Sequence, residues 1–261
     1  MRKAITAGVG VLVLAGLVWG GSEPWKTKPF AQWDANDLRK VMNDSPWAKQ
    51  VDVPATWKPS DNNGAPGTGG GLSPTGSSPG VGNMGGRNSG GTAGAPLGGA
   101  GTGGVGPSPT GTPTASFEVR WSSSRTLRAA AVRSMVLGNG MSEADADKQL
   151  EQPQKYYEVT VLGRDMQPFA GLDEGTLKAS TFLVAKKSKQ KVSPESVHID
   201  VGSDGKTVQG VIFSFPRTSD TGQATLGADE KGVEFSTTVT RANIKTSFDI
   251  AKMEDKDGRD L

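Results

Sequence analysis

The pattern of apolar and polar positions has a helical period early in the chain and an alternating period later. Apolar residues spaced three and four apart, directly preceded by Asp, Asn or Ser, are typical of capped amphipathic helices. The helices predicted in this way are 34–42, 125–137, 142–151 and a short one at 173–180. A further helix is expected to start at Pro46, with Ser45 as its cap, because proline at the first helical position loses no hydrogen bond.

Alternating apolar residues predict strands over much of the remaining sequence. The predicted strands are 51–53, 117–121, 156–162, 181–186, 196–201, 207–215, 232–239 and 243–251. The short links 202–206 and 240–242 are hairpin-like, so the strands on either side of each link are expected to be antiparallel neighbours. Helices that come early and strands that come late predict an α+β fold: a mostly antiparallel sheet with two or three early helices.

A stretch rich in Gly, Pro, Ser and Thr separates two apolar regions of the chain. Residues 59–114 include 20 glycines and 8 prolines, without the three-residue period of collagen. Such a composition cannot bury enough apolar surface to fold, and it predicts a long disordered linker. The predicted organisation is a signal peptide at 1–22, a Trp-rich docking segment at 23–58, the linker at 59–114 and an α+β domain at 115–261.

The first residues have the layout of a secretory signal. Arg2 and Lys3 precede the uncharged run 4–21, and a polar stretch follows. Cleavage after the run and retention as a single membrane anchor both stay open. The sequence contains no Cys, so it forms no disulfide and carries no lipid on a cysteine. We therefore expect a bacterial, extracytoplasmic protein, either periplasmic or secreted.

The Trp-rich docking segment is too short to form a core of its own. In a first interpretation it packs on the domain, with its strand at 51–53 on an exposed sheet edge. In a second, some of its tryptophans form a surface for a glycan or a partner protein. Trp25 and Trp57 lie nearest the polar ends and are the candidates for exposure, whereas Trp33 and Trp47 flank the helix and are expected in the core.

Composition argues against several classes of function. The formal net charge is only +2, which gives no field to concentrate nucleic acid, and membrane contact is expected only through an uncleaved signal. With no Cys and a single His, transition-metal and redox chemistry lack ligands, and no cofactor is expected. The lysines of "AKKSKQK", 185–191, predict a solvated hairpin or edge that discourages aggregation, with anion contact as the alternative.

Three patterns resemble functional motifs but lack the context that those motifs need. His198 shares a strand face with Ser196 and Asp200, yet residues two apart on a strand are spread about 6 to 7 Å, too far for a catalytic triad. "GTGGVG", 101–106, has the glycines of a dinucleotide site without the flanking strand and helix. "EDKDGRD", 254–260, resembles a calcium loop but lacks the first ligand and the final Glu.

Four segments together resemble the landmarks of an uncharacterised family of exported bacterial proteins. They are "WDANDLRKVMNDSPWAKQVDV" (33–53), "VRWSSS" (119–124), "IFSFPR" (212–217) and "FDIAKMEDKDGRDL" (248–261). In that family the gap between the two parts varies in length, which implies one domain with an expanded loop. The resemblance implies no activity. The tail "GRDL" departs from the more apolar ending that the family implies.

These observations predict an exported, non-catalytic protein that works as a binding or envelope-associated module. Trp25, Trp57 and Arg217 are the candidate binding residues; Arg217 follows the longest strand and either caps it or contacts a partner. The expected partner is an envelope protein or a glycan. Two other classes stay open: a hydrolase that uses His198, and a structural or spacer protein that works through its Gly-rich segment.

Overall fold

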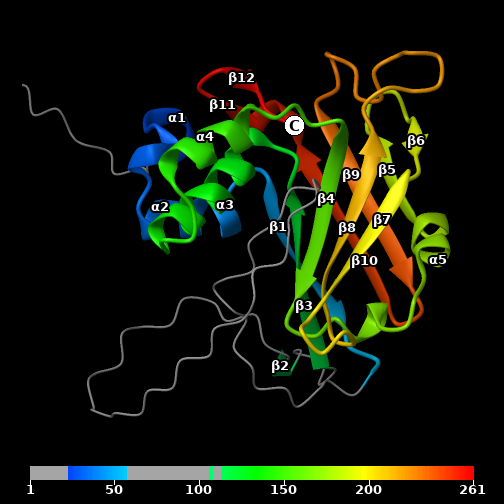
Figure 1. Cartoon of the computed structure of the whole chain (residues 1–261). Helices are drawn as coiled ribbons and strands as arrows, with labels where there is room; N and C mark the ends of the chain where they lie inside the picture. Colours follow the sequence, from blue (N-terminus) through cyan, green and yellow to red (C-terminus); the bar gives the residue numbers. More distant parts are fainter. Residues whose placement is uncertain (1–22, 58–105, 108–112) are drawn as a thin grey trace, which may run out of the picture.

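The computed structural model describes residues 23–57, 106–107 and 113–261 (Figure 1). The signal expected at 1–22 and nearly all of the linker lie outside the described residues. Pro113 and Thr114, placed in the linker by their composition, instead begin a strand. The expected α+β class is confirmed: strands pair only antiparallel among the described residues, and few helices accompany them.

The larger sheet, sheet A, combines a strand of the Trp-rich docking segment with strands of the predicted α+β domain. Its main path is β1 (Ala48–Pro54), β3 (Pro113–Trp121), β4 (Tyr156–Gly163), β8 (Val208–Pro216) and β7 (Ser196–Val201), and β2 (Gly106–Pro107) also pairs with β3. The predicted hairpin between β7 and β8 is confirmed, with His198 opposite Ile212. The strand predicted at 51–53 is part of β1, which forms one edge of sheet A.

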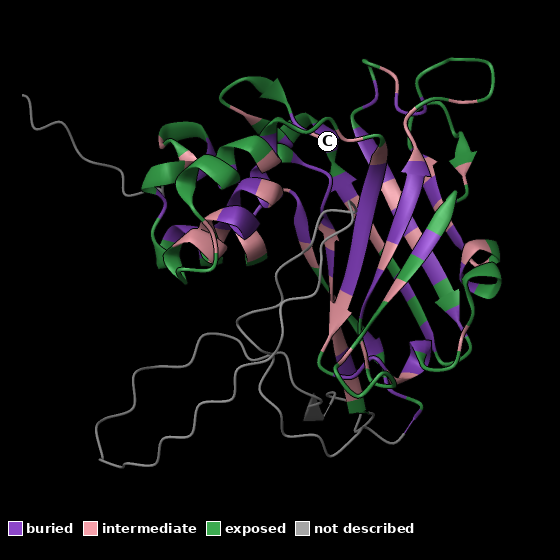
Figure 2. Cartoon of the chain, viewed as in Figure 1, coloured by how far each residue is buried: buried purple, intermediate pink, exposed green. Residues whose placement is uncertain are grey.

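A second sheet, sheet B, packs face to face against sheet A. Its order is β10 (Ala242–Asp249), β9 (Gly232–Val239), β5 (Thr181–Ala185) and β6 (Lys191–Val192). The hairpin between β9 and β10 is confirmed. The rings of Phe213 and Phe235 lie 5.5 Å apart across the sheets, and those of Trp121 and Phe248 lie 5.4 Å apart. Two packed sheets thus replace the single sheet expected, and the purple residues of Figure 2 concentrate between them.

The main helices gather at one end of the sheets (Figure 1). They are α1 (Pro24–Thr27), η1 (Phe30–Gln32), α2 (Ala35–Asn43), α3 (Arg125–Leu137) and α4 (Glu143–Glu151). The shorter elements elsewhere are η2 (Gln167–Phe169), α5 (Glu174–Ala179), η3 (Ile250–Lys252) and the hairpin of β11 (Glu254–Asp255) and β12 (Gly258–Arg259). None of the described helices is long and apolar enough to span a bilayer.

Side-chain caps set the helix starts where the sequence places them. The Asp34 carboxylate accepts from the amide of Asp37 at 2.9 Å, and the Asp37 side chain accepts in return from the amide of Asp34, which completes a capping box. Ser124 accepts from the amide of Leu127 and starts α3. Because these bonds satisfy otherwise unpaired amides, the helix starts follow from local chemistry.

The helix expected at Pro46 is not formed. Ser45 and Pro46 belong to a turn, in which the amide of Ala48 donates to the carbonyl of Ser45 at 3.2 Å. Strand β1 begins at Ala48, opposite Arg120 of β3, and leaves no room for a helical turn. Tertiary pairing thus overrides the local helix signal.

The Trp-rich docking segment packs in the same core as the rest of the chain. Strand β1 pairs with β3 from Ala48 to Pro54. The four tryptophans of the segment keep exposed fractions of 0–5%. The first interpretation, docking within the same chain, therefore describes the structure. The expectation that Trp25 and Trp57 are exposed is wrong: packing against the helices and the sheet covers both indoles.

Candidate functional site

Trp57, a predicted binding residue, is a buried anchor. Its indole Nε1 donates to Oδ2 of Asp165 at 2.9 Å, while Oδ1 of the same carboxylate accepts from the amide of Gln167 at 3.0 Å. Trp25, the second candidate, packs edge-on against Trp47 with ring centroids 5.6 Å apart. Trp57 thus joins the Trp-rich docking segment to Asp165, whereas Trp25 packs on another tryptophan of the segment; both are buried, so neither presents an open aromatic surface.

Arg217, the third candidate, makes its described contacts inside the molecule. It donates to the carbonyl of Tyr156 at 3.2 Å and to a main-chain oxygen of Leu261 at 2.6 Å. Its guanidinium lies over the ring of Tyr157, 4.3 Å from the centroid. Burial lowers the pKa of Arg217, although the side chain stays charged at neutral pH. Of the two roles proposed for Arg217, these contacts fit the structural one.

His198 lies on the outer face of sheet A, in the edge strand β7. It is exposed, as are Ser196 and Asp200 beside it. Among the described residues, His198 makes no hydrogen bond with a hydroxyl or a carboxylate. The strand places these three side chains side by side without the contacts of a triad. The hydrolase interpretation stays a prediction without a site built for it.

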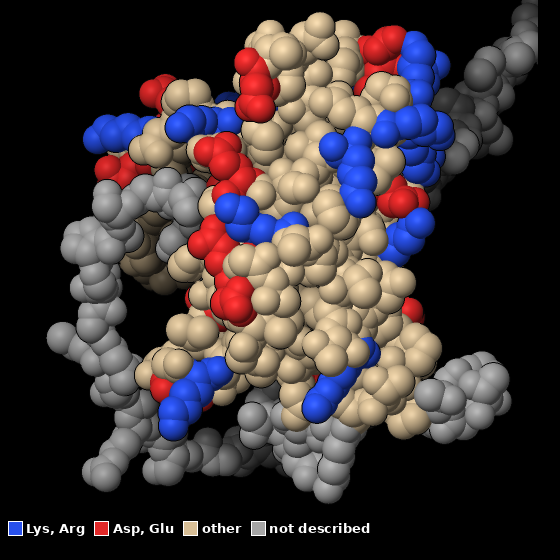
Figure 3. Space-filling view, turned by 90° about the vertical axis from the view of Figure 1, so that its right-hand side faces the viewer, with Lys and Arg blue, Asp and Glu red and all other residues tan. Residues whose placement is uncertain are grey.

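The lysine-rich stretch forms the hairpin of β5 and β6, at the edge of sheet B. Lys187 forms an ion pair with Asp229, and the amide of Lys187 donates to the buried carboxylate of Glu230 at 2.9 Å. Lys191 lies over the ring of Phe182. Basic side chains gather near the top of this face in Figure 3, amid a mostly uncharged surface. This matches the solvated edge that the sequence predicts.

The calcium-like stretch forms the tight hairpin of β11 and β12. Asp257 pairs with Lys256 at 2.7 Å, and its amide donates to the carboxylate of Asp255 at 2.8 Å. These carboxylates are engaged in holding the turn. No group of three or more His, Cys, Asp or Glu with metal-binding proximity occurs in the described part of the chain.

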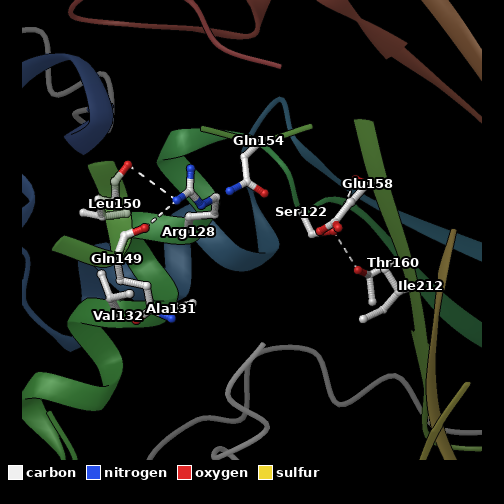
Figure 4. A pocket seen from close by; sticks show the side chains of 10 residues that line it. All are labelled: Ser122, Arg128, Ala131, Val132, Gln149, Leu150, Gln154, Glu158, Thr160 and Ile212. Atoms are coloured by element: carbon white, nitrogen blue, oxygen red, sulfur yellow. Dashed lines mark hydrogen bonds between the residues drawn. The ribbon is translucent and has the colours of Figure 1, made fainter. Parts of the chain in front are cut away.

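A cleft opens between the helices and the outer face of sheet A (Figure 4). The helical wall is formed by Arg128, Ala131 and Val132 of α3 with Gln149 and Leu150 of α4, and the sheet wall by Ser122, Glu158, Thr160 and Ile212, with Gln154 between the walls. The enclosed space amounts to about 30 Å³, which is room for one water-sized group. We refer to it as the helix–sheet cleft.

The sheet wall of the helix–sheet cleft is polar and internally hydrogen-bonded. Ser122 and Thr160 share a hydrogen bond of 2.8 Å between their hydroxyls, and the Ser122 hydroxyl also donates to the carbonyl of Glu158 at 3.2 Å. These three residues are buried. Glu158 and Thr160 lie two residues apart in β4 and so share one face of the sheet, and Ser122 directly follows the neighbouring strand β3.

The helical wall carries polar atoms without partners. Arg128 donates from one terminal nitrogen to the carbonyls of Gln149 and Gln152, at 2.6 and 3.1 Å, and so closes the end of α4. Its Nε is buried and has no hydrogen bond among the described residues, and the same holds for Oε1 of Gln149. Leaving such atoms unpaired costs about 1 to 3 kcal/mol each. The cleft therefore holds a free donor and a free acceptor.

The charge of Arg128 is balanced inside the fold. Burial lowers the pKa of Arg128, while the nearby carboxylates of Asp260 and Glu158 act in the opposite direction. The guanidinium remains protonated at neutral pH. A ligand in this cleft thus meets a compensated positive charge, which favours a neutral polar molecule over an anion.

The sequence did not single out the residues of the helix–sheet cleft. Glu158 and Thr160 lie in "YYEVTVL", where two polar residues on one face of an otherwise apolar strand are the signal that identifies a polar patch. Arg128 and Gln149 lie on separate predicted helices, and nothing in either helix indicates that the two side chains meet. Their proximity depends on how α3 packs against α4.

No protein-family model, curated protein or solved structure shows significant similarity to this chain. The resemblance to exported bacterial proteins therefore stays a prediction. The functional argument rests on the geometry of the chain itself.

Proposed function

We propose that this protein is an exported, non-catalytic binding module of the bacterial envelope, which holds a neutral ligand through a hydroxyl group that enters the helix–sheet cleft. A sugar unit of an envelope glycan has this chemistry. Export is supported by the signal-like residues 1–22 and by the resemblance stated above. The ligand class is supported by the unpaired donor and acceptor of the helical wall.

One observation carries the proposal: Nε of Arg128 and Oε1 of Gln149 both lack partners at the same cleft. A hydroxyl donates and accepts at once, so it matches both a free donor and a free acceptor. The apolar side chains of Val132 and Ile212 also line the cleft and suit the carbon that carries the hydroxyl. Because Nε of Arg128 and Oε1 of Gln149 are already buried, a ligand that bonds to them displaces no water from these atoms.

Calorimetric titration with a panel of neutral envelope saccharides tests the proposal. Gln149→Leu removes the acceptor and retains the size of the side chain, so we expect affinity to fall about tenfold, as the loss of one hydrogen bond implies. Gln152→Leu is the matched control, because Gln152 is exposed and its side chain does not line the cleft. We expect this variant to bind like the wild type.

Binding that survives Gln149→Leu unchanged would place the ligand elsewhere, and equal loss in both variants would indicate a general effect on folding. Export is tested separately by cell fractionation with and without residues 1–22. Cytoplasmic accumulation of the full-length chain would contradict the location.

A further inference from the structure

A second concave surface lies where the Trp-rich docking segment meets β10, away from the helix–sheet cleft. Its lining includes Trp25, Lys40, Ser45 and Lys49 from the segment, and Ser247, Asp249 and Lys252 from β10 and η3. The space is about 380 Å³, compared with about 30 Å³ for the helix–sheet cleft. We refer to it as the segment groove.

Two buried polar atoms at the segment groove have no partner. Nε1 of Trp25 and Oγ of Ser45 make no hydrogen bond within the described residues, although these residues are only 4% and 6% exposed. The other indoles of the segment are all paired: Trp33 donates to two carbonyls, Trp47 to Asp260 and Trp57 to Asp165. Trp25 is thus the one indole of the described segment that keeps a free donor.

The groove is lined by as many acids as lysines, but two of its lysines form no ion pair with described residues. Lys252 forms an ion pair with Asp249 at 3.4 Å, whereas Lys40 and Lys49 form none with described residues. Lys49 is half-buried. Burial and then repulsion by Lys252 lower its pKa, and Asp249 and Asp44 only partly oppose this. An anion beside Lys49 would favour the charged ammonium and so act against both effects.

We propose that the segment groove binds the carboxylate of a small molecule. The carboxylate oxygens accept hydrogen bonds from Nε1 of Trp25 and Oγ of Ser45, and they form an ion pair with Lys49. Together these groups offer two neutral donors and one cation, which suit two oxygens that share one charge. The site does not depend on the helix–sheet cleft or on the ligand proposed there.

A carboxylate fits this groove better than a phosphate. Glu23, Asp44 and Asp249 also line the groove, and they match its three lysines in number. These acids repel a doubly charged phosphate more strongly than they repel a singly charged carboxylate that pairs with Lys49. Acidic sugars and peptides with a free carboxyl end are two sources of the group.

The indole N–H of Trp25 is a direct reporter for the test. The Trp25 signal in ¹H–¹⁵N spectra of the full chain is assigned by its disappearance in Trp25→Phe. Titration with glucuronate, N-acetylalanine, glucose or phosphate then shows which ligand shifts this signal. We expect a carboxylate to shift the Trp25 signal most. The signals of Trp33, Trp47 and Trp57 serve as internal references, because their donors are already bonded.

The variants then test the charge. Lys49→Met keeps the length of the side chain without its ammonium, and we expect it to weaken carboxylate binding about tenfold, the scale of one hydrogen bond to a charged group. Lys148→Met is the control, because Lys148 pairs with Asp145 and neither residue lines the groove. Ser45→Ala gives a second variant if Lys49→Met fails to fold.

The response of the Trp25 signal to each ligand tests the proposal. A response to glucuronate alone supports the proposal with an acidic sugar as the source, and a response to N-acetylalanine alone supports it with a peptide end. A Trp25 signal that stays still with both carboxylates at millimolar concentration overturns the proposal. Equal shifts with phosphate overturn the preference for carboxylate, and equal weakening in Lys49→Met and Lys148→Met removes Lys49 from the site.

Discussion

The indole of Trp47 donates to the main-chain oxygen of Asp260 at 2.7 Å, across 213 residues of sequence. The carboxylate of the same Asp260 accepts from the first amides of α3, those of Arg125 and Thr126, at 2.5 and 2.8 Å. Trp47 is fully buried and Asp260 is 7% exposed. One residue near the end of the tail "GRDL" thus holds the Trp-rich docking segment and the start of α3 together.

Replacing Asp260 should weaken the fold through α3. Asp260→Ala leaves the bond from Trp47 to the main chain and removes the acceptor of two amides, so we expect the free energy of unfolding to fall by about 1 to 2 kcal/mol. Urea unfolding measures the change. Asp257→Ala, which alters an exposed carboxylate in the same tail, should change stability by less than about 0.5 kcal/mol. Equal effects would argue against capping as the cause.

The turn between β7 and β8 should show an acid-shifted carboxyl group. Asp204 accepts from the hydroxyl of Thr207 and from two turn amides, and these bonds lower its pKa to about 2. The stability that this group contributes is present above its unfolded pKa and is lost as pH falls from about 4 through 2. Carboxyl NMR titration measures the value. Thr207→Val should raise it, and a value near 3.8 in the wild type would contradict the bonding seen here.

Shortening the connection between β1 and β3 should stabilise the protein. Pro54 pairs with Thr114, and the amide of Ala55 donates to the carbonyl of Pro113 at 2.7 Å, so residues 58–112 close a loop between strand neighbours. Replacing 58–105 by six Gly/Ser residues, which keeps β2, should raise the free energy of unfolding by about 2 kcal/mol through loop entropy, and doubling the original length should lower it by about 0.6 kcal/mol. Urea unfolding of both variants checks the trend; a large loss on shortening would show that 58–105 adds contacts to the fold.

The tryptophans should be shielded from solvent. In a chain without residues 1–22, all five remaining indoles are at most 5% exposed. We expect acrylamide to quench the native fluorescence weakly and the urea-unfolded fluorescence strongly. A readily quenched native fraction that Trp57→Phe abolishes would show that the bond to Asp165 is open in solution.

Local chemistry made most of the fold predictable. Ser124 and Ser142 mark the starts of α3 and α4 because each hydroxyl satisfies an amide three residues ahead. The alternation in "GVEFSTTV" sets β9 because one side of the strand is buried. The separation into two sheets and the turn at Pro46 depend on partners far along the chain, which a local pattern does not contain.

The candidate sites were less predictable. Trp25 and Trp57 drew attention by residue type, but type alone does not say whether an indole faces solvent or a carboxylate such as Asp165. Arg128 and Gln149 are ordinary helix residues in the sequence, and they form a site only because α3 and α4 bring them together. Sequence patterns report periodicity, whereas a binding site is a convergence of side chains in space.

The position of Asp260 also sets an order of events during synthesis. Every described helix and strand precedes it, so the ribosome makes the acceptor for Trp47 and the cap of α3 after the elements that they join. Until then the indole has no acceptor at that point and α3 has two open amides. A chain that stops short of residue 260 lacks both bonds, which leaves it less compact and more accessible to proteases than a chain that includes Asp260.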